Sequence, residues 1–286
     1  MRKKTNVHLF SCLNNAPMAI VVRGVIMNFE IIDFHTHPFT GQKNNICNHK
    51  EHIPMDIEST RELLQGLGIT TICGSVVEVG KGDNESYWDK IRRNNRAALE
   101  LKDAYGDFYV PGFHVHPDFI DESINEMKLM HSLGFNLIGE LVPYMDGWKD
   151  YSCEGFSVLL DQAAKYNMIV SFHSIDNDNM DKMVQSHKDV IFVAAHPGEY
   201  PDFMRHVERA KKNENYYLDL SGTGLFRHGM LRRAIDEMGV DRILFGSDYP
   251  TCNPAMFVGG VVLDSLITDS EKEKILSGNA KRLLGV

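Results

Sequence analysis

Histidine and carboxylate side chains stand at the ends of five apolar runs of this chain. They are His35, His37, Glu140, His173, His196 and Asp248. Imidazole nitrogens and carboxylate oxygens together suit a divalent transition metal. Because side chains alternate along a strand, His35 and His37 face the same side and can reach one ion. The six side chains therefore predict a metal site, if the fold brings these ends together.

Eight apolar runs rich in β-branched residues recur about 30 residues apart, the length of one strand-helix unit. They span residues 31–37, 69–77, 108–116, 136–141, 168–173, 190–196, 216–221 and 242–248. Helix-start signals of the capping-box type lie between them, at residues 59–62, 123–126 and 270–273. This alternation predicts an α/β fold, a (β/α)8 TIM barrel in one domain, residues 27–286, after a short N-terminal extension, residues 1–26. The carboxyl ends of barrel strands meet at one face, so the six side chains should converge there.

No single member of this set is diagnostic, because a lone histidine at a strand end is more often a hydrogen-bonded structural residue. Six such residues at five strand ends are harder to explain in that way. Left without partners in an apolar barrel mouth, each buried polar group would cost about 1–3 kcal/mol. A metal ion would remove that cost for all six together.

The composition narrows the class of protein. The chain has 286 residues, 43% hydrophobic and 24% charged, which is ordinary globular usage and allows a sizeable core. Its net charge of −9 argues against general nucleic-acid or anionic-membrane binding, since both need a cationic surface. Five cysteines without a C-x-x-C pair fit a reducing cytoplasm. We expect a cytoplasmic protein with a small-molecule substrate and no nucleic-acid or membrane partner, and leave open whether it forms a homodimer.

Six motifs follow one another along the chain. They are DFHTHP at 33–38, GE at 139–140, SFH at 171–173, AHPG at 195–198, LFGSDYP at 244–250 and GNAKRLLG at 278–285. In this order they resemble the amidohydrolase superfamily, in its amidohydrolase-related (type 2) branch, over residues 31–286. The resemblance implies a metal-dependent TIM barrel with five residues at the metal centre: His35, His37, His173, His196 and Asp248. The superfamily includes hydrolases of amides, esters and lactones, and this branch also includes non-oxidative decarboxylases and hydratases of small carboxylic acids.

Glu140 bears on the number of ions. In the superfamily, members with two metals usually have a carboxylated lysine or a glutamate at the end of strand four, as TatD-like deoxyribonucleases do. Members with one metal, including the decarboxylases, generally lack a carboxylate ligand there. Glu140 as a ligand predicts two ions, and the alternative is an outer hydrogen-bond acceptor or a substrate contact. We expect zinc, with manganese, cobalt or nickel as alternatives.

The predicted reaction uses water activated by the metal. A divalent ion lowers the pKa of bound water to about 7. Asp248 would take the proton and hand it to the leaving group, while His173 and His196 or the metal would polarise the substrate carbonyl. Asp33, one layer deeper, would orient a ligand. We therefore predict a hydrolase of an amide, ester or lactone, with a decarboxylase or hydratase of a small carboxylic acid as the alternative.

Four further residues are candidate substrate contacts. His116 ends the third apolar run and is equally compatible with a structural role. Tyr144 and Trp148 follow the fourth run and could wall a pocket for an apolar or aromatic substrate, or simply pack. Arg227 follows the seventh run and could pair with a substrate carboxylate, or lie solvated at the surface.

Overall fold

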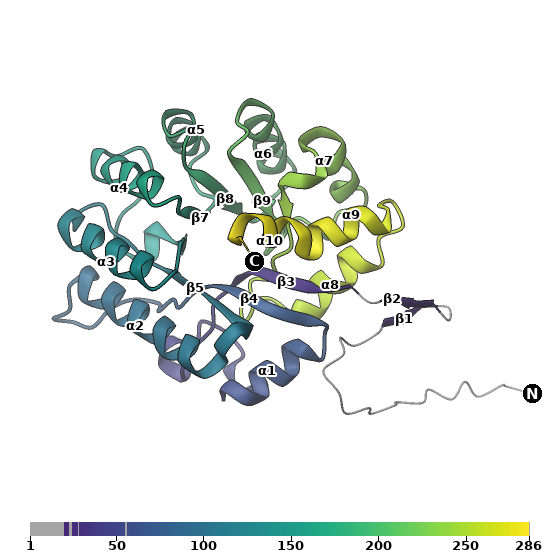
Figure 1. Ribbon diagram of the computed structural model, residues 1–286, viewed down its shortest axis with the longest axis horizontal. Helices are drawn as coiled ribbons and strands as arrows, with labels where there is room; N and C mark the ends of the chain where they lie inside the picture. The colour runs from purple at the N-terminus through teal and green to yellow at the C-terminus, as the bar shows by residue number, and fades with distance from the viewer. Residues whose placement is uncertain (1–19, 23–24, 28, 55, 286) are drawn as a thin grey trace, which may run out of the picture.

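Eight parallel strands form a closed barrel in the computed structural model, which describes residues 20–22, 25–27, 29–54 and 56–285 (Figure 1). Each strand pairs with the next along the chain. They are β3 (Ile31–Thr36), β4 (Ile69–Ser75), β5 (Tyr109–Phe113), β6 (Leu137–Leu141), β7 (Ile169–His173), β8 (Ile191–Ala195), β9 (Tyr216–Asp219) and β10 (Ile243–Leu244). The barrel closes where the Phe34 N–H of β3 donates to Phe245 O at 2.9 Å and His37 N–H donates to Tyr249 O at 2.7 Å. The predicted (β/α)8 barrel is confirmed.

Helices surround the barrel, as Figure 1 shows. They are α1 (Ile57–Gln65), α2 (Tyr87–Tyr105), α3 (Ile120–Ser132), α4 (Glu154–Lys165), α5 (Asn177–Ser186), α6 (Tyr200–Lys212), α7 (Met230–Met238), α8 (Pro254–Val262), α9 (Asp269–Glu273) and α10 (Asn279–Leu284). A π-helix, Lys274–Gly278, joins α9 to α10. Among the described residues, no helix is both long and apolar enough to cross a bilayer.

Two buried apolar clusters hold the layers together. The larger lies between strands and helices, where for example Leu101 of α2 and Phe203 of α6 are fully buried. The smaller joins residues of seven strands, including Leu137 and Val193, to Ala280 of α10. Because α10 lies across one end of the barrel (Figure 1), it covers this second cluster. The opposite end of the strands remains for the polar side chains.

Most of the predicted N-terminal extension, residues 1–26, lies outside the described residues. In the described part, residues 20–22 pair with residues 25–27, and Met27 is the first residue of the predicted domain. Strands β1 (Ile20–Val22) and β2 (Val25–Met27) form a separate antiparallel ladder, with Ile20 opposite Met27.

The predicted helix starts are wrong by a few residues. Helix α1 is capped by Asp56, whose side chain accepts from Ser59 N–H at 2.8 Å, so Ser59 lies inside the first turn. Helix α9 begins with a capping box made by Thr268 and Glu271 rather than one at 270–273. The Ser123 hydroxyl, predicted to cap α3, instead accepts from His116 N–H at 2.9 Å. These polar side chains bond wherever the chain brings a partner, and the local spacing does not reveal which.

Candidate metal centre

Four of the predicted ligands converge at the carboxyl ends of β3, β6 and β10. His35 Nε2 lies 3.3 Å from His37 Nε2. Glu140 Oε2 lies 3.4 Å from the first nitrogen and 3.2 Å from the second. Asp248 Oδ1 completes the group, at 3.8 Å and 3.5 Å from the same nitrogens. The four side chains therefore lie around one centre.

The second oxygen of Glu140 faces the two remaining histidines. Glu140 Oε1 lies 2.9 Å from His173 Nδ1 and 3.6 Å from His196 Nε2, and the two rings are 4.8 Å apart. Glu140 thus stands between two sets of side chains that could hold a metal ion. One set is His35, His37 and Asp248, and the other is Glu140 itself with His173 and His196.

Hydrogen bonds at the Nδ1 atoms of His35 and His37 orient the two rings so that their Nε2 atoms point to the centre. His35 Nδ1 lies 2.9 Å from Asp219 Oδ2, and His37 Nδ1 lies 3.1 Å from the carbonyl oxygen of Ser75. Both partners accept, so each Nδ1 carries a proton and each Nε2 is the ring nitrogen that a metal ion could occupy at the centre. Two ring nitrogens and two carboxylates then face one another. This donor set fits a divalent cation.

The electrostatics of the cluster favour positive charge at its centre. Burial alone would raise the pKa of Glu140, yet charge on His35 and His173 holds it well below its usual range. Burial alone would lower the pKa of His35, and the carboxylates of Asp219 and Glu140 instead raise it well above the ordinary value. The protein therefore keeps Glu140 ionised and stabilises a cation beside it.

Two of the six residues have a backbone conformation that is rare outside glycine. The φ angle is 69° at His196 and 61° at Asp248. Such residues cost free energy unless the surroundings hold them, and they gather at functional sites. Asp248 is held by its N–H, which donates to His35 O at 2.8 Å, so the barrel closure itself positions this carboxylate.

The carboxylate that bonds the ring of His35 is Asp219, which the sequence analysis missed. Asp33, which was expected to orient a ligand, accepts from the backbone N–H of His35 at 3.3 Å, and from the N–H and hydroxyl of Ser247 at 2.9 Å and 2.5 Å. Asp33 thus supports the loop that carries Asp248. Asp219 lies within the predicted seventh run, residues 216–221, and is the last residue of the observed strand β9.

A small cavity of about 130 Å³ opens onto the cluster. Its walls are mostly apolar outside the cluster: Ile46, Val77, Val142, Tyr144, Met145 and Thr251. The half-exposed ring of Tyr144 lies 5.4 Å from that of His173, so this predicted contact does border the cavity. Trp148 is buried and packs against Tyr151 and Phe156, which makes it part of the core.

The other two predicted substrate contacts, His116 and Arg227, form hydrogen bonds or ion pairs within the protein. His116 Nε2 donates to the carbonyl oxygen of Asp146 at 2.8 Å, and its Nδ1 accepts from Asp118 N–H at 3.1 Å. Arg227 forms an ion pair with Glu199 and is not among the residues that line the small cavity. Neither side chain reaches the cluster.

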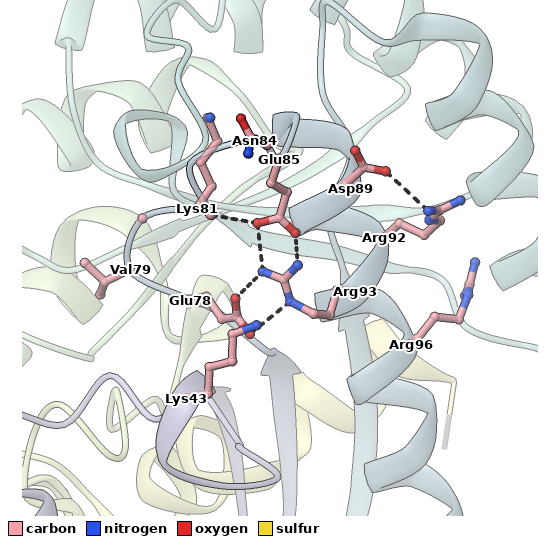
Figure 2. Close-up of a pocket in the computed structure, with 12 residues that line it drawn as sticks. Lys43, Glu78, Val79, Lys81, Asn84, Glu85, Asp89, Arg92, Arg93 and Arg96 are labelled. Carbon is pink, nitrogen blue, oxygen red and sulfur yellow. Dashed lines mark hydrogen bonds and ion pairs between the residues drawn. The ribbon is translucent and has the colours of Figure 1, made fainter.

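A larger and more open hollow, of about 1180 Å³, lies beside α2 (Figure 2). Arg93 points into it between Glu78 and Glu85 and pairs with both. Arg92 pairs with Asp89 at 3.2 Å. None of the six clustered residues lines this hollow, and its carboxylates pair with its own guanidinium groups. Size alone therefore does not identify the reactive site.

Comparison with known proteins agrees with the barrel fold and shows the family of the chain. Residues 32–286 match the family model described as amidohydrolase. No curated protein matches the chain. Among solved structures, 2,6-dihydroxybenzoate decarboxylase from Rhizobium is 19% identical, with a TM-score of 0.67 over 90% of this chain and 99% of the other. A dihydroxybenzoic acid decarboxylase from Polaromonas sp. JS666 with bound manganese is 16% identical, with a TM-score of 0.67 over 90% and 97%. A probable 2-pyrone-4,6-dicarboxylic acid hydrolase from Acinetobacter baumannii is 16% identical, with a TM-score of 0.64 over 90% and 100%.

Proposed function

Because the chain belongs to the amidohydrolase family, we propose that it is a metal-dependent hydrolase that cleaves an amide, ester or lactone bond in a small molecule. The observation that carries the proposal is the position of Glu140. Its two carboxylate oxygens face two separate groups of histidines, at 3.2–3.4 Å on one side and 2.9–3.6 Å on the other. A carboxylate in that place suits two ions, and two-ion sites are typical of hydrolytic enzymes. The catalytic unit we propose is residues 27–286.

The proposed ligands divide between the two ions. His35, His37 and Asp248 would hold one, His173 and His196 the other, with Glu140 shared. A divalent cation in this place supplies Lewis acidity, which makes water acidic near neutral pH and polarises a carbonyl group. Zinc is our first choice for this nitrogen and oxygen set, and manganese, cobalt and nickel are alternatives.

In the proposed reaction, a carboxylate of the protein transfers the proton from water to the leaving group. Asp248 is the proposed general base, because Oδ1 faces the cluster and the carboxyl group is partly open to the cavity, with 11% of its side chain exposed. It would take a proton from the attacking water and return it to the leaving nitrogen or oxygen as the bond to the carbonyl carbon breaks. His173 and His196 also border the small cavity, where they would steady the oxyanion.

The small cavity favours an apolar or planar group next to the bond that breaks. Val77, Val142 and Met145 form its walls, and the exposed ring of Tyr144 stands beside His173. Burial, followed by the charge on Glu140, raises the pKa of the Tyr144 phenol above its ordinary value. The phenol is therefore a neutral donor that could hydrogen-bond an oxygen of the substrate.

The test is a combined metal and substrate analysis. Protein purified without chelators should contain two equivalents of metal, and a set of lactones, esters and amides should include a substrate. Asp248→Asn should reduce turnover by at least about a hundredfold, the usual contribution of a general base. Asp107→Asn, at a fully exposed carboxylate, is the matched control and should leave turnover unchanged. Turnover that survives both Asp248→Asn and complete metal removal would refute the mechanism.

A lyase is the second candidate, supported by the compact apolar cavity, which suits a small aromatic acid. One equivalent of metal, release of CO2 from an aromatic acid and little effect of Glu140→Gln would favour a decarboxylase. One equivalent of metal with addition of water to a double bond would favour a hydratase. Two equivalents with a loss of one ion in Glu140→Gln would favour the hydrolase.

A further inference from the structure

A second cavity, of about 270 Å³, meets the small cavity at the candidate metal centre. His173 and His196 line both cavities, so the two cavities adjoin at these rings. Sites for small molecules usually occupy about 300–1,000 Å³. The small cavity alone falls below that range, whereas the two together reach it. A substrate of ordinary size would therefore extend past the two histidines into the second cavity.

The second cavity differs from the first in chemistry. Polar side chains from several elements line it: Ser174, Asn177, Glu199, Asp202, His206 and Thr223. We call it the polar cavity. Of these, His206 on α6 is almost completely buried, with 1% of its surface exposed. A buried imidazole facing a cavity needs a partner, which makes its hydrogen bonds informative.

The proton of the His206 ring can be placed from its neighbours. Arg209 Nη1 lies 3.1 Å from the Tyr216 hydroxyl and must donate to it, because a guanidinium has no acceptor. The Tyr216 hydroxyl then donates its own proton to His206 Nδ1, at 2.6 Å. Burial, with the charge of Arg209 adding to it, lowers the pKa of His206 to about 3, so the ring is neutral. A neutral ring that accepts at Nδ1 carries its proton at Nε2.

The Nε2–H group of His206 has little to bond within the protein. Among the described residues it contacts Ser174 Oγ at 3.4 Å, which is long for a hydrogen bond. Ser174 gives its own proton to the carbonyl oxygen of Ala195 at 2.5 Å. His206 thus offers a fixed, neutral donor to the polar cavity, held in place by Tyr216 and Arg209 as positioning residues.

Acceptors stand at the rim of the same cavity. The exposed Asp202 accepts from Asn177 Nδ2 at 3.3 Å, and Glu199 pairs with Arg227. A neutral donor inside and carboxylates at the rim suit a group that both accepts and donates. A carboxylate on the ligand would be repelled by the carboxylate of Asp202. The chemistry that fits is a hydroxyl or carboxamide group.

We infer that the polar cavity is a substrate subsite in which the His206 Nε2–H binds a neutral hydroxyl or carboxamide group, remote from the bond that breaks. The inference rests on the proposed function, since the reacting end of the substrate must lie at the metal centre between His173 and His196. It assigns the substrate class as a small molecule with an apolar part next to the metal and a neutral polar part beyond the two histidines.

The experiment measures binding of hydroxamic acids to the zinc-loaded protein by titration calorimetry. Acetohydroxamate, which chelates the metal and has no tail, is the reference probe. Straight-chain hydroxamates of increasing length are then compared in pairs, one ending in a hydroxyl and the other in a methyl group. At one length the hydroxyl probe should bind about five- to tenfold more tightly, the gain expected of one well-placed hydrogen bond.

The gain should disappear in His206→Phe and fall in Asp202→Ala, whose side chain lies at the exposed rim. His131→Phe, at a ring stacked on Tyr166 away from both cavities, is the matched control and should keep the gain. Metal content and acetohydroxamate affinity should be the same in all four proteins.

The possible outcomes separate the two proposals. If acetohydroxamate binds but no hydroxyl probe exceeds its methyl partner in the unaltered protein, the subsite is refuted and the metal centre stands. A preference that persists in His206→Phe, or a carboxylate tail that binds more tightly than the hydroxyl tail, also refutes the subsite. If acetohydroxamate does not bind to protein that contains metal, the proposed centre fails and the subsite fails with it.

Discussion

A buried ion pair holds the loop that lines the small cavity, and removing one partner should destabilise the protein strongly. Lys90 of α2 has no exposed side-chain surface, and its ammonium group lies 2.9 Å from Asp146 Oδ1. The same group donates to the carbonyl oxygen of Met145 at 2.8 Å. Tyr144 and Met145, the residues that border the cavity, precede Asp146 directly. Lys90 thus fixes this loop from behind.

The magnitude follows from burial. Lys90→Met would leave the carboxylate of Asp146, 5% exposed, without its cation, and breaking a buried pair in this way costs about 3–5 kcal/mol. A chain of 286 residues unfolds with an entropy of about 0.6 kcal/mol/K. The melting temperature should therefore fall by about 5–8 °C. Lys90→Met combined with Asp146→Leu should be less destabilised than Lys90→Met alone, because no charge is left unpaired.

The assay is thermal unfolding of the metal-loaded protein, with urea unfolding to obtain free energies. Arg205→Met is the control, because Arg205 is 44% exposed and pairs with Asp178 and Asp181 at the surface. Such exposed pairs contribute less than about 1 kcal/mol. If Lys90→Met is no worse than Arg205→Met, or if the double variant is less stable than the single one, the reasoning about the buried pair is wrong.

Three further predictions concern the site and its surroundings. Gly222→Ala would place a Cβ 2.3 Å from the His196 ring, so metal content should fall. Gly229→Ala has the same kind of positive φ, but its Cβ would lie at an ordinary contact distance of 3.9 Å from Leu266, so this variant should keep its metal. The pKa of His206 is about 3 in the folded protein and about 6.5 in the unfolded chain. Below pH 6.5 the unfolded chain therefore binds the proton more readily, so the contribution of His206 to stability is lost as pH falls. The stability difference between the wild type and His206→Phe, measured in urea, should therefore shrink by about 2 kcal/mol from pH 7.5 to pH 5, and a constant difference would contradict a buried neutral ring. Removal of metal by dipicolinate should lower the melting temperature, and added zinc should restore it in the wild type but not in His37→Ala.

The barrel could be predicted because its signals are local. Each strand is a short apolar run, and the eight runs predicted from the sequence match the eight strands observed. The helix starts could not be predicted as well, because a serine has several ways to use its hydroxyl. Ser123 has the spacing of a cap, but its hydroxyl bonds the backbone of His116, which comes from the preceding strand and loop. That competition depends on tertiary structure.

The meeting of these polar side chains at one end of the barrel was predictable for the same reason, whereas the hydrogen bonds that support them were not. Strand ends meet at one face of any barrel, so polar residue types at those ends predict a shared centre. Asp219 lies 184 residues from His35, and only the closed barrel brings its carboxylate to the ring. Polar residues in the loops gave weaker predictions. His116 and Arg227 are residue types that often contact substrates, yet here His116 bonds the backbone and Arg227 pairs with Glu199.

His116 and His37 both follow a strand, but they differ in how many of their ring nitrogens the backbone occupies. The backbone occupies both ring nitrogens of His116, so nothing remains for a ligand. His37 gives only Nδ1 to the backbone, and its Nε2 faces His35 Nε2 at 3.3 Å and Glu140 Oε2 at 3.2 Å. Carboxylates gathered around these nitrogens repel one another unless positive charge, from a protonated ring or a metal ion, lies among them. We therefore expect metal binding to stabilise this barrel.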